Sequence, residues 1–345
     1  MYHRCLDRWD EQRAARGDAL KAPSEMVLDS KLSFPKAAKA KTIDELSDLS
    51  DLASKDPAFF DLPHEVDPGF DRAGEWLTFP SSLQTETEAN NTVWSKITEG
   101  RERDQALIVF HHWNATKRNR QLASFFAKQG ITVFEIAMPY HFERRRHGTN
   151  HASHMLSPNI GQTLLSVRQA VLDGRKLIRW IEAEGYRDIA VLGMSLGSWV
   201  AGLVAANDTA VSKAALFLTA GSLADMVWTG RATGHIRASL DPVIKIGDLR
   251  RAWRPINLEN YVTKLARPDL SIQVVLGKRD TVVLPDLSGQ FIDALIDAGA
   301  SPNVLKLNCG HYSLTLPPYI VRTGLKVRKF LKQRHFTYAA IAQRD

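Results

Sequence analysis

The sequence is poor in cysteine and has no long apolar run. Cys5 and Cys309 are its only two cysteines, too few for the disulfide framework that stabilises many small secreted domains. No stretch approaches the ~18 consecutive apolar residues of a membrane-spanning helix. Residues 1–17 are polar and charged, without the apolar core of a secretory signal peptide. We therefore expect a cytoplasmic protein with no integral membrane segment.

Nucleic-acid motifs are also missing, although the chain is basic. The formal net charge is +7, but the basic residues are scattered apart from a few clusters, and no aromatic pattern accompanies them. We expect no nucleic-acid partner. The chain has 345 residues, of which 44% are hydrophobic and 24% charged. This composition is that of a globular protein with one large core, or one core and an appendage.

Residues 1–72 form a polar region without strand signals. Within it, residues 42–45 match a capping box, and an apolar residue then recurs every three positions from Ile43 to Leu52. This spacing predicts a short amphipathic helix. We interpret residues 1–72 as a helical extension that packs on the main domain or covers the mouth of its site, with a partly ordered tail as the alternative. Residues 336–345 are expected to form a C-terminal tail.

The most informative stretch is residues 189–199, IAVLGMSLGSW. Its first four residues predict a buried strand, and apolar residues at helical spacing after the serine predict a helix. The turn between them has the pattern G-x-S-x-G, in which Gly193 and Gly197 allow the two backbones to approach closely. Ser195 at the apex would point its hydroxyl into open space, and the backbone N–H of Leu196 would face the same side. This arrangement is typical of a nucleophilic serine beside an oxyanion donor.

On these residues the chain resembles the α/β-hydrolase superfamily. The resemblance spans about residues 74–335, and we expect the hydrolase domain at residues 73–335. It implies a mostly parallel eight-stranded sheet flanked by helices, and a triad in the chain order Ser, Asp or Glu, His. The expected strands cover residues 75–79, 91–97, 106–110, 131–137, 189–193, 214–220, 271–276 and 304–307, and a long helix is expected over residues 164–181.

Two later segments supply the acid and the base that the resemblance implies. Asp280 follows an apolar strand in the segment GKRDTVVLP, where the superfamily carries its acid, and His311 follows the last expected strand, where it carries its base. Ser195 would attack a carbonyl, His311 would relay the proton, and Asp280 would orient His311. Asp225 is the alternative acid, because some members carry the acid after the sixth strand.

The segment His111-His112-Trp113-Asn114 ends the third expected strand. It corresponds to the superfamily segment in which a His-Gly pair precedes the second oxyanion donor. Here His112 stands in the place of the glycine, and histidine does not adopt a positive φ freely. The donor could therefore be the backbone N–H of Trp113 or that of Asn114. His112 could instead be a polar wall of the pocket, and His111 is expected to pack a loop.

Side chains that follow strands at their carboxyl ends are candidates for substrate contact, because open α/β sheets bind ligands there. The run of arginines at residues 144–146 could clamp a carboxylate or phosphate group, or it could be a solvated loop. The candidates for substrate binding are His112, Tyr140, His141, Arg144 and Met194.

The histidines near residue 147 do not indicate a metal site. His147 and His151 have the spacing of one helical turn, but Gly148 between them argues against a helix. We expect neither a metal nor another cofactor. Asp173, inside the expected long helix, is expected to be a surface charge.

Between residues 221 and 268 the regular alternation of strands and helices lapses, and the resemblance implies a cap or lid over the pocket there. The leading hypothesis is a serine hydrolase that cleaves a small-molecule carboxylic ester through an acyl-enzyme. Amidase, peptidase, thioesterase and C–C hydrolase reactions could use the same triad, and a hydrolase-fold protein could also bind a ligand without turnover. The sequence leaves the natural substrate and the oligomeric state undetermined.

Overall fold

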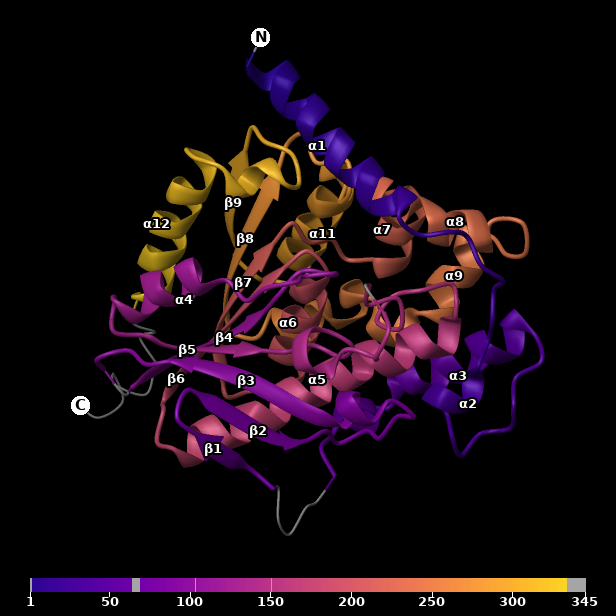
Figure 1. Cartoon of the computed structure of the whole chain (residues 1–345), viewed down its shortest axis with the longest axis horizontal. Coiled ribbons are helices and arrows are strands. Elements are labelled where there is room, and N and C mark those ends of the chain that lie inside the picture. Colours follow the sequence, from indigo (N-terminus) through magenta and orange to yellow (C-terminus); the bar gives the residue numbers. More distant parts are fainter. Residues whose placement is uncertain (1, 64–68, 103, 150, 334–345) are drawn as a thin grey trace.

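The fold is built on one mixed β-sheet (Figure 1). The computed structural model describes residues 2–63, 69–102, 104–149 and 151–333, so the predicted tail at residues 336–345 lies outside them. In the described residues the sheet has nine strands in the order β1-β2-β3-β5-β4-β6-β7-β8-β9. They are β1 (Asp71–Ala73), β2 (Trp76–Pro80), β3 (Thr92–Thr98), β4 (Gln105–Phe110), β5 (Thr132–Ile136), β6 (Asp188–Met194), β7 (Val211–Phe217), β8 (Ser271–Gly277) and β9 (Asn303–Leu307).

The pairing agrees with the predicted mostly parallel sheet. Strands β1, β2, β3 and β5 pair antiparallel in turn, and every other neighbouring pair is parallel. The prediction of eight strands misses β1, a three-residue edge strand whose residues are all exposed. Because β1 buries no side chain, apolar alternation could not reveal it. Strand β7 also ends earlier than expected, since Leu218 has a φ of 54°.

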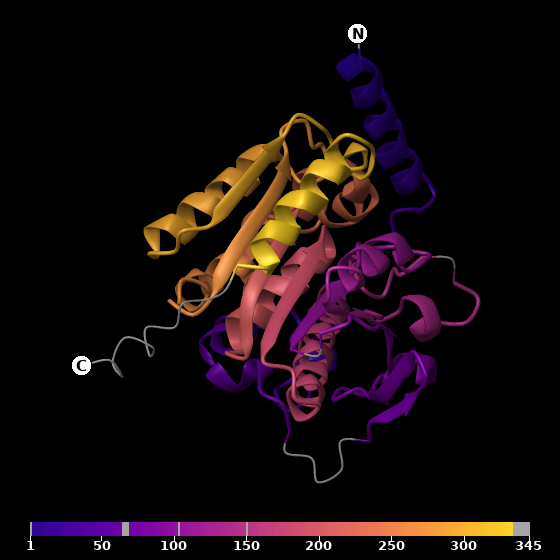
Figure 2. The same cartoon turned by 90° about the vertical axis from the view of Figure 1, so that its left-hand side faces the viewer.

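Helices cover both faces of the sheet (Figure 2). On one face, α4 and α12 share an apolar cluster with the central strands, and on the other face α5, α6 and α11 share a larger one. The helices are α1 (Tyr2–Ala19), α2 (Ser30–Ser33), α3 (Ile43–Lys55), α4 (Arg120–Ala127), α5 (Ile160–Ala183), α6 (Leu196–Asn207), α7 (Leu223–Thr229), α8 (Gly234–Leu240), α9 (Ile246–Ala252), α10 (Val262–Leu265), α11 (Pro285–Asp297) and α12 (Tyr319–Leu331). Two covered faces explain why the central strands read as continuous apolar runs.

The long helix predicted over residues 164–181 is confirmed as α5, which packs on the same face of the sheet as α6 and α11. A Cβ on its Gly174 would lie 2.8 Å from Cζ of Phe110 in β4 and 3.0 Å from Cγ2 of Val204 in α6. The glycine therefore allows α5 to approach both elements more closely than a larger residue would.

The N-terminal region packs on the rest of the chain in two places. The predicted amphipathic helix is confirmed as α3, whose N-cap Thr42 accepts a hydrogen bond from the Glu45 N–H at 3.2 Å. Helix α3 packs on α9, and Ser50 donates to the Ala252 carbonyl at 2.7 Å. Helix α1, which the sequence patterns did not predict, lies across the end of the sheet where β8 and β9 finish (Figure 1).

Residues 221–268 contain α7 to α10 and no strand. None of the helices in the described part of the chain combines the length and the apolar character needed to cross a membrane.

Candidate active site

Ser195 occupies a sharp turn between β6 and α6, as the G-x-S-x-G pattern predicts. Its φ of 53° and ψ of −126° are values that residues with a side chain rarely adopt. A Cβ on Gly193 would lie 2.2 Å from the Gly197 carbonyl oxygen, and a Cβ on Gly197 would lie 2.3 Å from that of Phe110. Both positions therefore exclude every residue except glycine, and the turn that they permit presents the serine hydroxyl at the end of the sheet.

Asp280 and His311 reach Ser195 from the neighbouring strands β8 and β9. The Nε2 atom of His311 lies 3.1 Å from Ser195 Oγ, and its Nδ1 atom lies 2.8 Å from Asp280 Oδ2. The three side chains are buried, with 9%, 3% and 9% exposure for Ser195, Asp280 and His311. A carboxylate accepts the Nδ1–H, so the other ring nitrogen is left to accept the serine proton.

The Asp280 carboxylate is itself held by the backbone. Its Oδ1 atom accepts hydrogen bonds from the N–H groups of Val282 at 2.7 Å and Val283 at 2.9 Å. Because these contacts fix Oδ1, Oδ2 is directed at the imidazole. The alternative acid, Asp225, lies on α7 and binds Arg250 at 3.0 Å, so it does not take this place.

Two backbone N–H groups are candidates for oxyanion donors. Leu196 is the first residue of α6, where N–H groups have no intrahelical acceptor. The N–H of Asn114 already donates to Nε2 of His141 at 3.0 Å. Among the contacts of the described residues, none occupies the N–H of Trp113. Of the two donors that the sequence left open, the geometry therefore favours Trp113.

A cavity of about 200 Å³ opens onto Ser195 and His311. Of the predicted substrate-binding residues, His112 and Met194 line it. Residues from the 221–268 segment and from α1 also contribute to its wall. The lining residues are Arg13, His112, Trp113, Leu156, Met194, Ser195, Leu196, Leu218, Met226, Ala232, Thr233, Val282, His311, Tyr312, Leu314 and Thr315.

Comparisons with known proteins agree with this fold. Residues 111–241 match the family described as alpha/beta hydrolase domain containing 18. The structure resembles acetyl xylan esterase 1 from Thermoanaerobacterium sp., with a TM-score of 0.58 and 15% identity over 93% of this chain and 98% of that chain. It resembles an esterase from Pyrococcus furiosus with a TM-score of 0.53 and 15% identity over 90% and 98%. The chain therefore has the α/β-hydrolase fold, and residues 111–241 carry the match to a family of that fold.

A larger protein with the same fold matches this chain over only part of its own length. The acylaminoacyl peptidase from Pyrococcus horikoshii matches with a TM-score of 0.57 and 10% identity over 72% of this chain. The match covers 42% of the peptidase, so the chain spans about two fifths of that protein. A search among curated proteins finds no match to the sequence.

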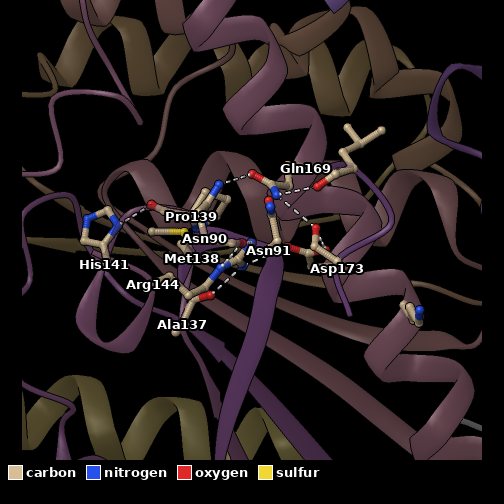
Figure 3. Close-up of polar contacts among 12 residues, drawn as sticks. Asn90, Asn91, Ala137, Met138, Pro139, His141, Arg144, Gln169 and Asp173 are labelled. Atoms are coloured by element: carbon tan, nitrogen blue, oxygen red, sulfur yellow. Dashed lines mark hydrogen bonds and ion pairs between the residues drawn. The ribbon is translucent and has the colours of Figure 1, made fainter. Parts of the chain in front are cut away.

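The interpretation of the arginine run at residues 144–146 requires a correction at Arg144. Arg144 is fully buried, and Figure 3 shows it directed toward Ala137, Asn90 and Asp173. It donates to the Ala137 carbonyl at 3.0 Å, to the Asn90 carbonyl at 2.7 Å and to Asp173 Oδ2 at 2.8 Å. The structure thus places Arg144 neither in a substrate clamp nor in a solvated loop, because its donors are used inside the protein.

Asp173 requires the matching correction. It was expected at the surface, but its side chain is only 1% exposed. Its second oxygen accepts from Ser81 Oγ at 2.7 Å, so both carboxylate oxygens have partners. A charged residue is almost never fully buried without such pairing. The partner of Asp173 is Arg144, 29 positions earlier in the chain, so the local sequence of α5 could not reveal the burial of Asp173.

Tyr140 and His141, two of the predicted substrate-binding residues, do not line the cavity. His141 is buried, which lowers its pKa to about 3, and the neutral ring accepts the Asn114 N–H through Nε2. Tyr140 is buried beside Gln162, whose Nε2 donates to the tyrosine hydroxyl at 3.2 Å. Neither residue lines the cavity, so the structure does not place them against a substrate; His141 instead holds the backbone of Asn114, the residue after Trp113.

His111 joins the ends of β4 and β5, which confirms its predicted role in packing a loop. Its Nε2 accepts the Met138 N–H at 3.1 Å, and its Nδ1 donates to the His112 carbonyl at 2.9 Å. Burial lowers the pKa of His111 well below its usual value, so the ring stays neutral. Among the residues that the structure describes, no three His, Cys, Asp or Glu side chains gather in a group that could hold a metal ion.

Sequence reasoning expected residues 1–72 to pack on the main domain or to cover the mouth of its site, but it named no residue of α1. Arg13 lines the cavity, and its guanidinium lies 5.6 Å from the centre of the Tyr312 ring. Asp10 is 3% exposed and contacts the segment after His311. No motif links α1 to a loop 302 positions away, and the acidic residues on one face of this helix were the only available signal.

Proposed function

We propose that this protein is a serine hydrolase that cleaves a carboxylic ester through an acyl-enzyme intermediate. The proposal depends on one observation, the continuous contact from Asp280 through His311 to Ser195, with distances of 2.8 and 3.1 Å. A serine hydroxyl is a weak nucleophile unless a base within hydrogen-bond reach accepts its proton. Two of the structural relatives are esterases, which supports an ester substrate.

In the acylation half, Ser195 Oγ bonds to the ester carbonyl carbon while His311 Nε2 takes the hydroxyl proton. The carbonyl electrons move onto oxygen, and the N–H groups of Leu196 and Trp113 stabilise this oxyanion. Asp280 stabilises the imidazolium and keeps the ring oriented. When the oxyanion collapses, the C–O bond to the leaving alcohol breaks, and the alcohol takes the proton from His311.

In the deacylation half, water replaces the alcohol. It gives a proton to His311 while its oxygen bonds to the acyl carbon, and a second oxyanion forms at the same N–H groups. Collapse breaks the bond to Ser195 Oγ, which recovers its proton from His311, and the carboxylic acid leaves. Removing one oxyanion donor typically lowers kcat by about 10²–10³-fold.

The cavity supports a small substrate. Its volume of about 200 Å³ lies below the ~300–1,000 Å³ of sites for drug-sized ligands, and most of its lining is apolar. We propose that residues 221–268 act as the cap over a short acyl chain, since Met226, Ala232 and Thr233 contribute to the wall. We also propose that residues 1–72 form an extension of the hydrolase domain at 73–335, and that the protein acts in the cytoplasm.

The first experiment is labelling with a fluorophosphonate probe. The intact protein and the Ser195→Ala variant are incubated with the probe, and the adduct is located by mass spectrometry. We expect an adduct on Ser195 that the variant lacks. A folded protein that forms no adduct contradicts the proposal and supports a ligand-binding protein without turnover.

The second experiment compares acyl substrates. The p-nitrophenyl esters of acetate, butyrate and octanoate are tested beside a matched p-nitroanilide and a thioester. We expect the highest kcat/KM for the acetate or butyrate ester. Faster cleavage of the anilide or the thioester would instead assign an amidase, peptidase or thioesterase to the same triad.

A further inference from the structure

We propose that Asp10 is a positioning residue for the reaction, through which α1 holds the loop that carries His311. This inference rests on the proposed function of Ser195, Asp280 and His311. His311 lies on a loop between β9 and α12 that contains only one short helical turn. The position of His311 therefore depends on what packs against this loop, and α1 is the helix whose Asp10 contacts it.

The contacts of Asp10 are directed at the backbone beside His311. Its Oδ1 atom accepts the N–H of Tyr312 at 2.6 Å and the N–H of Ser313 at 2.9 Å. These are the two residues that follow the histidine, so the carboxylate fixes the chain within two peptide bonds of the imidazole. Hydrogen bonds to an ionised acceptor are about twice as strong as those between neutral groups.

The loop that carries His311 has space for the Asp10 side chain because residue 310 is a glycine. A Cβ on Gly310 would lie 2.5 Å from Asp10 Oδ2, so the residue before His311 must be small for the carboxylate to enter. Gly310 also donates its N–H to Ser313 Oγ at 2.8 Å. His311 thus lies in a tight turn in which the N–H groups of the next two residues, Tyr312 and Ser313, donate to Asp10.

A second carboxylate of α1 addresses the other triad loop. Asp7 lies three positions before Asp10, which places both side chains on one helical face. Asp7 forms a two-point ion pair with Arg279, the residue that precedes Asp280. One turn of α1 therefore contacts both the loop of the acid and the loop of the base, and it couples their relative position to the docking of the helix.

Other acidic residues of α1 do not have this arrangement. Glu11 pairs with Arg231 at 2.5 Å, but both side chains are more than half exposed, at 54% and 63%. Exposed pairs of this kind contribute little. Glu11 is adjacent to Asp10 on the same helix, so Glu11→Gln is a matched control for the removal of one negative charge.

The experiment uses the full chain and compares Asp10→Ala, Asp10→Asn and Glu11→Gln with the unmodified protein. The measurements are kcat and KM for p-nitrophenyl acetate, the rate of fluorophosphonate labelling, and the downfield proton resonance of the His311 Nδ1–H, assigned by its loss in His311→Ala. Displacement of a reacting group by about 1 Å can cost about 10²-fold in rate. We therefore expect Asp10→Ala to lower kcat and the labelling rate by about 10–100-fold with little change in KM, and to shift or broaden the resonance.

Asp10→Asn keeps an oxygen that can accept both N–H groups, so we expect it to restore most of kcat, and Glu11→Gln to match the unmodified protein. Equal kcat and an unchanged resonance in Asp10→Ala would overturn the proposal. If Asp10→Ala does not fold, Asp10→Glu keeps the charge but displaces it by one methylene group, and unchanged kcat in that variant would overturn the proposal as well.

The two proposals fail in different ways. An unmodified protein that neither labels nor hydrolyses any ester contradicts the serine-hydrolase function. In that outcome the Nδ1–H resonance of His311 still tests whether Asp10 positions the histidine. A resonance that Asp10→Ala perturbs and Glu11→Gln does not would support the hold of α1 on the loop, and a resonance unaffected by either would overturn it.

Discussion

Asp280 Oδ2 lies 2.8 Å from Nδ1 of His311, although the two residues follow different strands. Strands β8 and β9 are parallel neighbours, so their carboxyl ends deliver both residues to the same edge of the sheet. Two backbone N–H groups hold the other oxygen of Asp280. The contact therefore depends on the register between β8 and β9 and on the turn after Asp280, in which the N–H groups of Val282 and Val283 hold the carboxylate.

Replacing Asp280 with asparagine is expected to abolish most activity without unfolding the protein. An amide in place of the carboxylate favours the wrong tautomer of His311, a change that costs about 10⁴-fold in kcat in a serine protease. We expect a loss of about 10³–10⁴-fold here, measured with p-nitrophenyl acetate. Asp225→Asn is the control, since Asp225 binds Arg250 instead of His311. Comparable losses in both variants would refute the assignment of the acid.

Gly197 is expected to tolerate no side chain. A Cβ would lie 2.3 Å from the Phe110 carbonyl oxygen and 2.4 Å from that of His111, and neither backbone can move without displacing β4. We expect Gly197→Ala to lower the free energy of unfolding by about 3 kcal/mol. Gly289→Ala in α11 meets no atom within 4 Å and should raise it by about 0.5–1 kcal/mol. Urea unfolding measures both, and similar effects of the two substitutions would argue against the tight turn at Ser195.

Breaking the buried ion pair between Arg144 and Asp173 is expected to be strongly destabilising. Asp173→Ala leaves the guanidinium buried without its counter-charge, which costs about 3–5 kcal/mol. The control is Asp241→Ala, which removes an exposed pair with Arg237 and should change stability by at most about 0.5 kcal/mol. The double variant Arg144→Met/Asp173→Leu should recover part of the loss. Equal stability of Asp173→Ala and the unmodified protein in urea would show that the pair is unimportant.

Stability is expected to fall as the pH is lowered below about 6.5, the usual pKa of a histidine. In the folded protein burial lowers the pKa of His141 to about 3. Between these values the unfolded chain binds the proton and the folded chain does not, so the free energy of unfolding increases with pH across the window and levels off above it. For His141 alone the loss between pH 7 and pH 5 is about 2 kcal/mol.

The measurement is urea unfolding at pH 7 and pH 5 for the unmodified protein and His141→Gln. The variant carries no titrating ring at this position, so its loss between the two pH values should be smaller by about 2 kcal/mol. The difference between the pH values isolates the titration from any constant effect of the substitution. Identical losses in both proteins would mean that His141 is not held in its neutral form.

The sheet and the serine turn could be predicted because their signals are local. Residues 189–193 form an apolar run, and Gly193 and Gly197 flank the serine at positions where the structure admits no Cβ. Asp280 and His311 could be selected because the resemblance to the superfamily implies an acid and a base after these two strands. Strand β1 could not be predicted from local patterns, because its three residues are exposed and therefore show no alternation of apolar and polar side chains.

Local patterns therefore predicted most of the strands, the long helix α5 and the sharp turn at Ser195, whereas the resemblance to the superfamily implied the chain order of the candidate triad. Only the tertiary structure decided the partners of charged residues. Arg144 and Asp173 are 29 positions apart, and Asp10 meets the His311 loop from the far end of the chain. Periodicity records which face of an element is buried, but a buried charge requires a partner from another element. That partner is identified only when the folded chain brings the two segments together.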